Sequence, residues 1–433
     1  MPECSLRTKI HFSSEDVFKW HLRPHVVERF LLPPFKVIRS SPPIDEGSEV
    51  EITGKWGIFP VHVVVQHHGL RYPEEFYDLQ VKGPFKYWKH LHKAIPIDDK
   101  SCFWEDRISF SSIFSKWIKK DIASTLRWRH KRLQNDLELF HRFPFQKKRI
   151  LISGASGFVG REISSFLQAA GHDVIKLSRR LALSKDAIFW DPEKEHFKLS
   201  DFEGFDAFIH LAGENIGSGP WTAEKKDKVF RSRCRDTWLL AKIISRLAHP
   251  PKKLIAASAI GFYGNRPHEI GDETSKKGKG FLPDLVSSWE HVSDFLRSTK
   301  VVHARFGLIL GPQGGVLPKL LTPIRLGIGG VIFGSGSQMQ SWISIEDVVG
   351  SLYHLLHQDI EGPVVITSPN SVTQKQLVLF LARRYKQNMV WKIPNLFGEM
   401  GKELFMASCF ASPSRLVETG YHFLEPRLED LSF

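Results

Sequence analysis

The sequence predicts an α/β fold built on a doubly wound parallel sheet, preceded by a separate α+β domain. Three observations indicate this organisation. From Arg149 onward, a glycine-rich turn joins an apolar strand to an amphipathic helix. Strand-like and helix-like segments alternate after that turn, as expected for a parallel sheet. The residues before it are rich in Trp, Phe and His, with strand-like alternation followed by one long helical pattern.

Composition limits the class of protein. With 433 residues and 42% hydrophobic content, the chain can form two or three domains with sizeable cores. No apolar run approaches the roughly 18 residues of a membrane-spanning helix, and the first residues lack the apolar core of a signal peptide. We therefore expect no membrane span and a cytoplasmic location. The four cysteines have no paired spacing, which indicates neither a disulfide framework nor a zinc site.

The formal net charge of +13 raises the possibility of a nucleic-acid partner. The basic residues are spread along the chain, however, and no nucleic-acid motif accompanies them. We therefore expect no nucleic-acid partner and interpret the charge as favouring solubility and anionic ligands.

The front region reads as a sheet followed by a helix. The segments EVEITGKW, HVVVQHH and CFWEDRISF alternate as antiparallel strands do. From about Ser112 to Phe140, apolar residues recur at mostly three- or four-residue spacing, which predicts a long helix with one buried face. Pro144, within FHRFPFQKK, then breaks the helix directly before the glycine-rich segment.

Histidines in this region raise the possibility of a metal site. His67 adjoins His68, and the alternating His90 and His92 would share one face of a strand. No acidic or cysteine partner stands at ligand spacing nearby in the sequence. We therefore expect no metal.

The glycine-rich segment has the features of a dinucleotide-binding βαβ unit, or Rossmann opening. Gly154 permits a tight turn, Gly157 lets the backbone approach a pyrophosphate, and Gly160 lets the helix pack closely on the strand. The helix N-terminus would offer its N–H groups to the anion. FIHLAG is expected to be the fourth strand, with small residues at its end along the cofactor. The predicted cofactor residues are Gly154, Ser156, Gly157, Phe158, Val159, Gly160, Leu211, Ala212 and Gly213.

The end of the second strand indicates which cofactor is bound. Ser178, Arg179 and Arg180 stand where an NAD site needs an acidic residue. An arginine can pair with the 2′-phosphate of NADP, so we expect NADP(H), with Arg179 and Arg180 as cofactor residues. The alternative is that both arginines belong to a solvated strand end.

The front region resembles the START-like (SRPBCC) ligand-binding superfamily over roughly residues 6 to 138. The segments that carry the resemblance are HFSSEDVFKWHLRPHVVERFLLP, YDLQVKGPFKYWKHLHK and LRWRHKRLQNDL. The resemblance implies a helix-grip fold, in which a curved sheet and a long C-terminal helix enclose a cavity for an apolar ligand. Plain packing of the aromatic side chains is the alternative.

Nearly all of the remaining chain resembles the extended short-chain dehydrogenase/reductase superfamily, and within it an atypical epimerase-like family that often carries a START-like domain in front. The motifs are GASGFVG, HLAGENI, ASAIGFYG, GFLPDLVSSWE, ARFGLILGP and SWISIEDV. The resemblance implies a small C-terminal domain from about Pro369. The expected domains are therefore 1–140 START-like, 141–148 linker, 149–368 Rossmann and 369–433 C-terminal.

The expected catalytic residues depart from the family pattern. When GFLPDLVSSWE is aligned with the usual catalytic helix, Leu282 replaces the Tyr and Val286 replaces the Lys, and neither can move a proton. The remaining candidates are Ser258 as a hydrogen-bond donor, Tyr263 as a replacement acid and Arg233 as an anion partner.

Each candidate has a structural alternative. Ser258 could cap a strand end, Tyr263 could be part of the core, and Arg233 could face solvent. Packing or capping roles are equally compatible with the motif residues Glu290, Trp342 and Asp347.

The sequence therefore predicts an NADP-binding oxidoreductase or epimerase-like protein that acts on a small molecule. The alternative is a nonenzymatic protein that senses NADPH or carries an apolar ligand, which the missing Tyr and Lys favour. The sequence does not identify the substrate.

Overall fold

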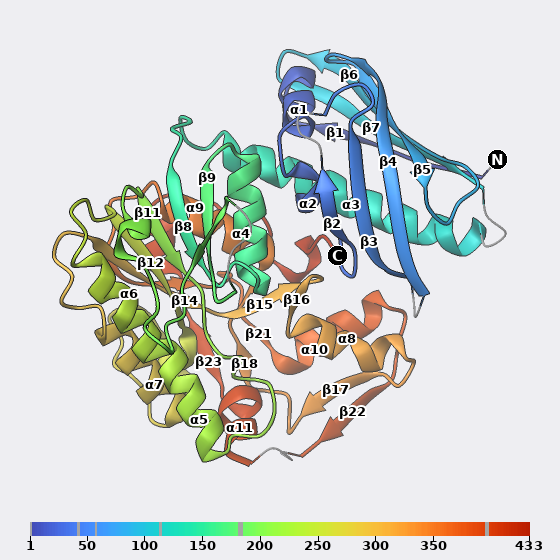
Figure 1. Cartoon of the computed structure of the whole chain (residues 1–433). Coiled ribbons are helices and arrows are strands. Elements are labelled where there is room, and N and C mark those ends of the chain that lie inside the picture. The colour runs from blue at the N-terminus through green and yellow to red at the C-terminus, as the bar shows by residue number, and fades with distance from the viewer. Residues whose placement is uncertain (1, 41–43, 57–58, 112–114, 181–184, 395–397) are drawn as a thin grey trace. The chain divides into compact units, whose positions relative to one another are not determined.

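The chain forms two compact units in the computed structural model, which describes residues 2–40, 44–56, 59–111, 115–180, 185–394 and 398–433 (Figure 1). The first unit comprises residues 1–147, 165–172 and 432–433, and the second comprises 148–164 and 173–431. Residues 112–114, where the long helix was expected to begin, lie outside the described part. None of the described helices combines the length and apolar character needed to cross a membrane.

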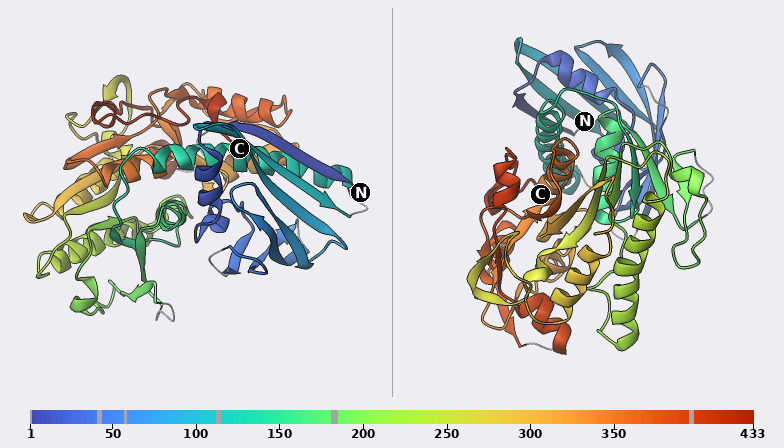
Figure 2. Two further views of the ribbon diagram at one scale, coloured as in Figure 1. Left: turned by 90° about the horizontal axis from the view of Figure 1, so that it is seen from above. Right: turned by 90° about the vertical axis from the view of Figure 1, so that its left-hand side faces the viewer.

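The first unit is built on a seven-stranded antiparallel sheet with the order β1-β7-β6-β5-β4-β3-β2, which confirms the predicted antiparallel sheet. The long helix α3 packs on it through Ile118, Ile122 and Leu126, which meet Ile108 and Phe110 of β7. The two further views in Figure 2 show the long helix beside the strongly twisted sheet. The elements are β1 (Glu3–Ile10), α1 (Ser14–His21), α2 (Val26–Arg29), β2 (Lys36–Ser40), β3 (Glu49–Trp56), β4 (Phe59–Arg71), β5 (Glu75–Lys82), β6 (Trp88–Asp98), β7 (Ser101–Phe110) and α3 (Ser115–Phe140).

The second unit contains a seven-stranded sheet with the order β10-β9-β8-β11-β12-β14-β20, in which every strand pair is parallel. This is the doubly wound order expected from the sequence, and β11 is the predicted fourth strand. Figure 1 shows α4 and α6 on opposite faces of the sheet. Its main elements are β8 (Arg149–Ser153), α4 (Phe158–Ala169), β9 (Asp173–Ser178), β10 (Ala187–Phe189), β11 (Ala207–His210), α5 (Ala223–Phe230), α6 (Asp236–Ile244), β12 (Lys253–Ala259), α7 (Phe281–His291), β14 (Lys300–Phe306), α9 (Ile345–Leu355) and β20 (Gly362–Ile366).

The order of the strands reverses between β8 and β11. The next strand after β8 pairs on one side of it, whereas β11 pairs on the other. Loops that leave the carboxyl ends of these two strands therefore diverge, and the space between them is where such sheets bind ligands.

Three smaller sheets complete the second unit. Their orders are β13-β23-β18-β21, β16-β15-β19 and β17-β22. Strands from the end of the chain thus pair with strands that precede residue 369. The elements are β13 (Arg266–Gly271), β15 (Leu308–Gly311), β16 (Gly314–Gly315), α8 (Leu317–Arg325), β17 (Gly330–Phe333), β18 (Met339–Gln340), β19 (Trp342–Ser344), β21 (Val372–Thr373), α10 (Gln374–Arg384), β22 (Val390–Ile393), α11 (Gly398–Gly401), β23 (Cys409–Ala411) and α12 (Ser414–Glu418).

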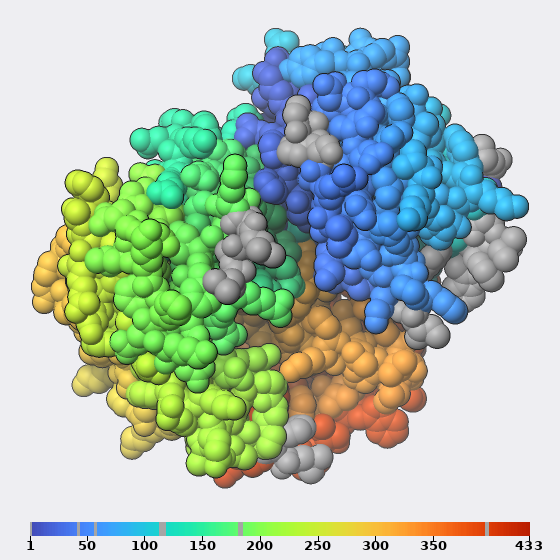
Figure 3. Space-filling model, viewed as in Figure 1, coloured from blue at the N-terminus to red at the C-terminus, as the bar shows by residue number. Residues whose placement is uncertain are grey.

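Figure 3 shows the surface of one face of the molecule, with residues of the first unit mainly in blue and residues of the second unit in green to red. The core of the second unit includes the apolar face of α6, where Leu239, Leu240 and Ile243 pack with Leu151 of β8 and Leu254 of β12. This packing fixes the central strands whose ends carry the candidate site.

A buried ion pair ties α2 to α3 in the first unit. The Arg29 guanidinium donates to the Asp136 carboxylate from Nε at 3.0 Å and from Nη2 at 2.7 Å. Both side chains are completely buried. Removing one partner would leave the other charge in a medium of low dielectric constant, which is more costly than the pair itself.

We therefore expect Asp136→Asn to lower the free energy of unfolding of the first unit by about 3–5 kcal/mol, measured by urea denaturation. The control is Glu15→Gln, which breaks the exposed Glu15–Lys19 pair and should leave the midpoint unchanged. Equal midpoints for Asp136→Asn and the unmodified protein would show that the buried pair does not hold this unit together.

Candidate functional site

The turn between β8 and α4 leaves room for an anion. Gly154 has φ +70°, and a Cβ there would lie 2.6 to 2.8 Å from the backbone of Leu211 and Ala212. A Cβ on Gly160 would collide with the carbonyl oxygen of Gly154. In contrast, a Cβ on Gly157 would meet only that oxygen, at 3.1 Å. Two glycines are therefore needed for close packing, and the third leaves open space at the start of a helix, where N–H groups attract anions.

Ser153 joins the ends of β8 and β11. Its hydroxyl lies 2.6 Å from His210 Nδ1 and accepts the N–H groups of Leu211 at 3.2 Å and Ala212 at 3.4 Å. Burial lowers the pKa of His210 to about 4, so the imidazole is neutral. Its Nδ1 then accepts a hydrogen bond from the Ser153 hydroxyl. Ser153 was not predicted from the sequence, although a polar residue at the end of an apolar strand is a detectable signal.

A cavity of about 680 Å³ opens beside this junction. Val159, Leu211, Ala212 and Gly213 line it, so the structure brings together two segments that were expected to hold the cofactor. Phe158 has a structural role instead. Its side chain packs closely on Gly314, where an added Cβ would lie 2.8 to 3.0 Å from it. Ser156 is exposed in the turn itself.

Arg179 and Arg180 follow β9 and are exposed. The backbone N–H of Arg180 donates to Ser178 Oγ at 3.1 Å, which bends the chain at the strand end. Burial raises the pKa of Asp236 to about 6, although Arg235 and Arg179 act in the opposite direction. Arg179 is therefore close enough to α6 to favour the charged form of Asp236, the first residue of that helix.

The wall of the cavity formed by α7 is apolar where a catalytic pair would be expected. Leu282 and Val286, one helical turn apart, both line the cavity, and Trp289 continues the same face. A Cβ on Gly261 would lie 3.5 Å from Leu282 and 3.9 Å from Val286, in ordinary contact. This wall can exclude water but cannot exchange protons.

A buried polar network lies behind this wall. Ser258 Oγ donates to Glu290 Oε1 at 2.5 Å. Arg305 donates to the same carboxylate from Nε at 2.8 Å and from Nη2 at 2.6 Å. Ser258 also lines the cavity, so its oxygen connects the network to any ligand there. Glu290 was left open between a functional role and a packing or capping role, and Arg305 was not predicted from the sequence, although an arginine inside the apolar strand β14 is a recognisable signal.

Tyr263 belongs to this network from the side away from the cavity. Its side chain is fully buried and is absent from the cavity lining. The hydroxyl donates to the Asp272 carbonyl at 2.7 Å and accepts from Arg305 Nη1 at 3.1 Å. Burial raises the pKa of Tyr263 even though Arg305 opposes the shift. Arg305 is therefore the cation that contacts this phenol.

Arg233 lines the cavity next to Gly213. It donates to the Glu214 carbonyl at 3.0 Å and lies over the Trp289 ring at 5.1 Å. Burial lowers its pKa to about 10, which still leaves the guanidinium charged at neutral pH. The structure thus places one of the predicted candidates where an anionic group of a ligand would meet it.

The end of the chain contributes a further wall that sequence reasoning did not assign to the site. Lys402, Glu403 and Cys409 line the cavity. Glu403 accepts the N–H groups of Phe281 at 2.9 Å and Leu282 at 2.7 Å, and so caps α7. Burial raises the pKa of the Cys409 thiol to about 12, which makes it a poor nucleophile.

Two motif residues have structural roles. Asp347 is buried and accepts the N–H groups of Leu424 at 2.7 Å and Glu425 at 2.9 Å. Trp342 is also buried, and its Nε1 donates to the Asn370 carbonyl at 2.8 Å. Both therefore secure the end of the chain, in agreement with the packing interpretation.

The first unit contains its own cavity of about 520 Å³, lined largely by apolar side chains of the sheet, α2 and α3. His67, His90 and His92 line it together with Asp78. The sequence argument that no acidic residue accompanies these histidines was wrong, because it considered only neighbours along the chain. Strand pairing brings Asp78 opposite both His67 and His90.

Comparison with known proteins identifies the relatives of this chain. Residues 150–366 match the NAD dependent epimerase/dehydratase family. Epimerase family protein Mb2239 of Mycobacterium bovis is 32% identical over 282 residues, which cover 63% of this chain and 93% of that protein. The human epimerase family protein SDR39U1 is 32% identical over 290 residues, which cover 65% of this chain and 97% of that protein.

Two solved structures extend the comparison. The crystal structure of a nucleoside-diphosphate sugar epimerase from Corynebacterium glutamicum is similar with a TM-score of 0.82 and 27% identity, over 98% of this chain and 88% of that one. The crystal structure of human SDR39U1 with NADPH is similar with a TM-score of 0.61 and 30% identity, over 66% of this chain and 97% of that one. The chain belongs to the NAD dependent epimerase/dehydratase family.

Proposed function

We propose that the second unit binds NADPH and exchanges hydride with a small molecule whose oxygen contacts Ser258. The observation that carries the proposal is that one cavity extends from the ends of β8 and β11, where the strand order reverses, to the buried polar network of Ser258, Glu290 and Arg305. Val159 and Gly213 line one part of this cavity and Ser258 lines another. One bound dinucleotide could therefore reach from the glycine turn to Ser258, whose hydroxyl donates to the Glu290 carboxylate.

The turn residues supply the phosphate site in this proposal. Gly157 and the N-terminus of α4 would hold the pyrophosphate, and the segment Leu211–Gly213 would contact the rest of the cofactor. Arg179 and Arg180 would meet the 2′-phosphate after β9, where an NAD site needs an acidic residue. The structure of human SDR39U1 with NADPH supports this choice of cofactor.

When bound, the nicotinamide supplies or accepts the hydride. Ser258 already donates its own proton to Glu290, so its oxygen is available to accept a proton from a substrate hydroxyl. As the hydroxyl is oxidised, its proton passes to Ser258, whose proton passes to Glu290, and the reverse reaction follows the same route. Arg305 holds Glu290 in place with two hydrogen bonds, and Leu282 and Val286 keep water out.

The cations of the cavity favour a substrate with an anionic group. Arg233, Lys279 and Lys402 all line it. A diphosphate would find charge-assisted donors there. The relative from Corynebacterium glutamicum, a nucleoside-diphosphate sugar epimerase, supports nucleotide sugars as the first substrates to examine.

For the first unit we propose a START-like domain, residues 1–140, that holds an apolar ligand. Its seven-stranded sheet and α3 surround the cavity of about 520 Å³, and Val26, Phe30, Val50 and Ile108 are among the apolar side chains that line it. A cavity of this size and character suits a small apolar molecule. Residues 141–148 would then be the linker to the Rossmann domain.

A turnover assay tests the proposed reaction. The full chain is incubated with NADPH or NADP⁺ and a panel of carbonyl compounds, alcohols and nucleotide sugars, and the absorbance of NADPH is followed. Substrate-dependent hydride transfer supports the proposal. Tight binding of NADPH without hydride transfer to or from any compound would instead favour a nonenzymatic sensor.

We expect a preference for NADPH over NADH, because each arginine can form charge-assisted hydrogen bonds worth about 1.5–3 kcal/mol with the 2′-phosphate. Calorimetric titration of both cofactors measures this preference. The double change Arg179→Ser and Arg180→Ser should abolish it and leave the affinity for NADH unchanged. Equal affinities for the two cofactors in the unmodified protein would refute the assignment.

We expect Ser258→Ala to reduce turnover about 10²- to 10³-fold with little change in NADPH affinity, because it removes the hydroxyl that meets the substrate oxygen. Tyr263→Phe is the matched comparison within the same network. It should lower the free energy of unfolding by about 1–3 kcal/mol, since the Asp272 carbonyl loses its donor, while most turnover remains.

Steady-state kinetics and denaturation of both variants distinguish the two roles. A folded Tyr263→Phe protein that loses two to four orders of magnitude in turnover would restore Tyr263 as the proton donor expected from the sequence. Full activity of Ser258→Ala would remove Ser258 from the proposed mechanism.

A further inference from the structure

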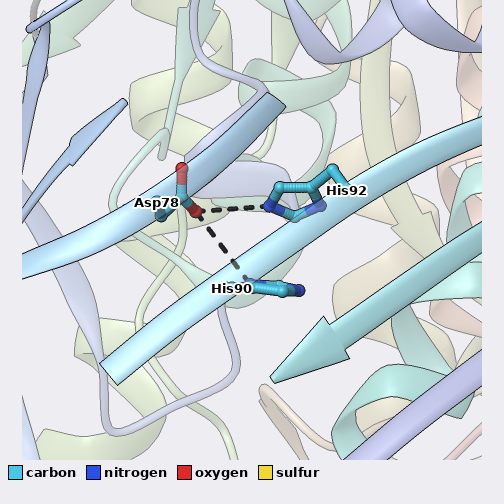
Figure 4. A group of neighbouring side chains, drawn as sticks. All are labelled: Asp78, His90 and His92. Carbon is cyan, nitrogen blue, oxygen red and sulfur yellow. Dashed lines mark hydrogen bonds and ion pairs between the residues drawn. The ribbon is translucent and has the colours of Figure 1, made fainter. Parts of the chain in front are cut away.

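Four strands of the first unit bring histidine and aspartate side chains together at one wall of its cavity. His67 of β4 pairs with Asp78 of β5, and Asp78 pairs with His90 of β6. His92 lies two residues further along β6, on the same face, and pairs with Asp106 of β7. Figure 4 shows the Asp78 carboxylate facing His90 and His92, which lie together on the neighbouring strand.

Hydrogen bonds behind the cluster orient the imidazole rings. His92 Nδ1 lies 2.6 Å from Asp106 Oδ1, and since a carboxylate only accepts, this nitrogen carries the proton. The lone pair of His92 Nε2 then faces Asp78 Oδ2 at 3.2 Å. His67 Nδ1 similarly donates to the Ser48 carbonyl at 3.0 Å, which leaves His67 Nε2 facing Asp78 Oδ1 at 3.3 Å.

His90 repeats the arrangement. Its Nε2 lies 3.2 Å from Asp106 Oδ1, and its Nδ1 lies 4.0 Å from Asp78 Oδ2. Asp106 thus stands behind two imidazoles whose other nitrogens are directed at one carboxylate. A carboxylate behind a histidine is the usual arrangement around a bound metal ion, because it fixes the ring and increases its basicity.

When His67 and His92 are neutral and carry their proton on Nδ1, their Nε2 atoms have no hydrogen to donate to Asp78. Asp78 Oδ1 is buried without a hydrogen-bond partner. The side chains of His90 and His92 are only 5% and 2% exposed. Acceptors that face one another inside a protein are unfavourable unless a cation lies between them.

The spacing suits a metal ion. One ligand atom each from Asp78, His90 and His92 lies within 4.8 Å of the other two. Ligand atoms bound at 2.0–2.1 Å around a tetrahedral ion are about 3.3 Å apart, so small side-chain movements would close the site. Imidazole and carboxylate ligands together suit zinc and similar transition metals better than calcium or magnesium.

We propose that Asp78, His90 and His92 bind one divalent transition-metal ion, with Asp106 orienting both imidazoles and an open coordination position toward the cavity. Three protein ligands leave that position for an exogenous ligand. The cavity around it is largely apolar, so the molecule that fits is apolar with one oxygen-bearing group that coordinates the metal.

The competing occupant is a proton. Although burial opposes the charged form, Asp106 and Asp78 raise the pKa of His92 to about 9, so without a metal the imidazole would be positively charged at neutral pH. A protonated His92 would satisfy part of the negative charge of the cluster. Measurement of metal binding therefore distinguishes the two occupants.

The experiment uses the full chain without a polyhistidine tag, stripped with a chelator and titrated with Co²⁺ and then Zn²⁺. We expect one Co²⁺ per chain with visible absorption bands of a nitrogen- and oxygen-ligated ion, displacement by Zn²⁺, and one Zn²⁺ per chain by elemental mass spectrometry after dialysis. Asp78→Asn and His92→Gln should lose the bound ion. Asp106→Asn should weaken binding about 10- to 100-fold without removing a ligand.

His68→Gln is the matched control, because His68 adjoins His67 on β4 but bonds to Glu46 on the other side of the strand. It should retain the ion. Circular dichroism verifies that each variant is folded. If a variant fails to fold, the cobalt spectrum and zinc content of the unmodified protein still show whether the site binds a metal ion. Absence of stoichiometric Co²⁺ and Zn²⁺ binding by the unmodified protein, or undiminished binding by folded Asp78→Asn and His92→Gln, would overturn the proposal.

Discussion

The close approach of the glycine turn to the end of β11 is the constraint on which the second unit depends. Gly154 cannot carry a Cβ because the backbone of Leu211 and Ala212 occupies that space. Ser153 holds the same junction through hydrogen bonds to both N–H groups. The two strand ends are therefore fixed against each other, and the proposed cofactor groove and substrate cavity both extend from this point.

Each of the two units contains a buried carboxylate that is paired with an arginine. Arg305 holds Glu290 with two hydrogen bonds, and Arg29 holds Asp136 in the same manner in the first unit. Such pairs gain specificity of position more than stability, because the cost of removing both charges from water is large. In the second unit this positional accuracy places Ser258 at the cavity that Leu282 and Val286 also line, and these two residues stand where the family pattern has a tyrosine and a lysine.

The sequence predicted the elements that follow from local patterns. Periodicity identified the antiparallel front sheet, the long helix and the parallel sheet, and glycine spacing located the turn before α4. Contacts between segments that are distant in the sequence could not be predicted from local patterns. Glu290 and Arg305 lie 15 residues apart on a helix and a strand, and their pairing depends on how α7 packs beside β14.

The cluster of the first unit shows the same limit. The side chains of Asp78 and His92 are 14 residues apart, and only the register of β5 with β6 brings them together. Tyr263 illustrates a question that the motif left open between a replacement acid and a core residue, because the fold buries its ring and engages its hydroxyl. Local patterns define elements, but strand register and packing define sites.

The central claim is that the turn at Gly157 holds a dinucleotide, and native mass spectrometry of the full chain with added NADPH tests it most directly. We expect the unmodified protein to gain the mass of one NADPH. Gly157→Ala places a Cβ where the pyrophosphate must approach and should prevent this gain, whereas Gly217→Ala, whose Cβ would meet only ordinary contacts, should not. Failure of the unmodified protein to bind NADPH, or equal binding by Gly157→Ala, would contradict the account.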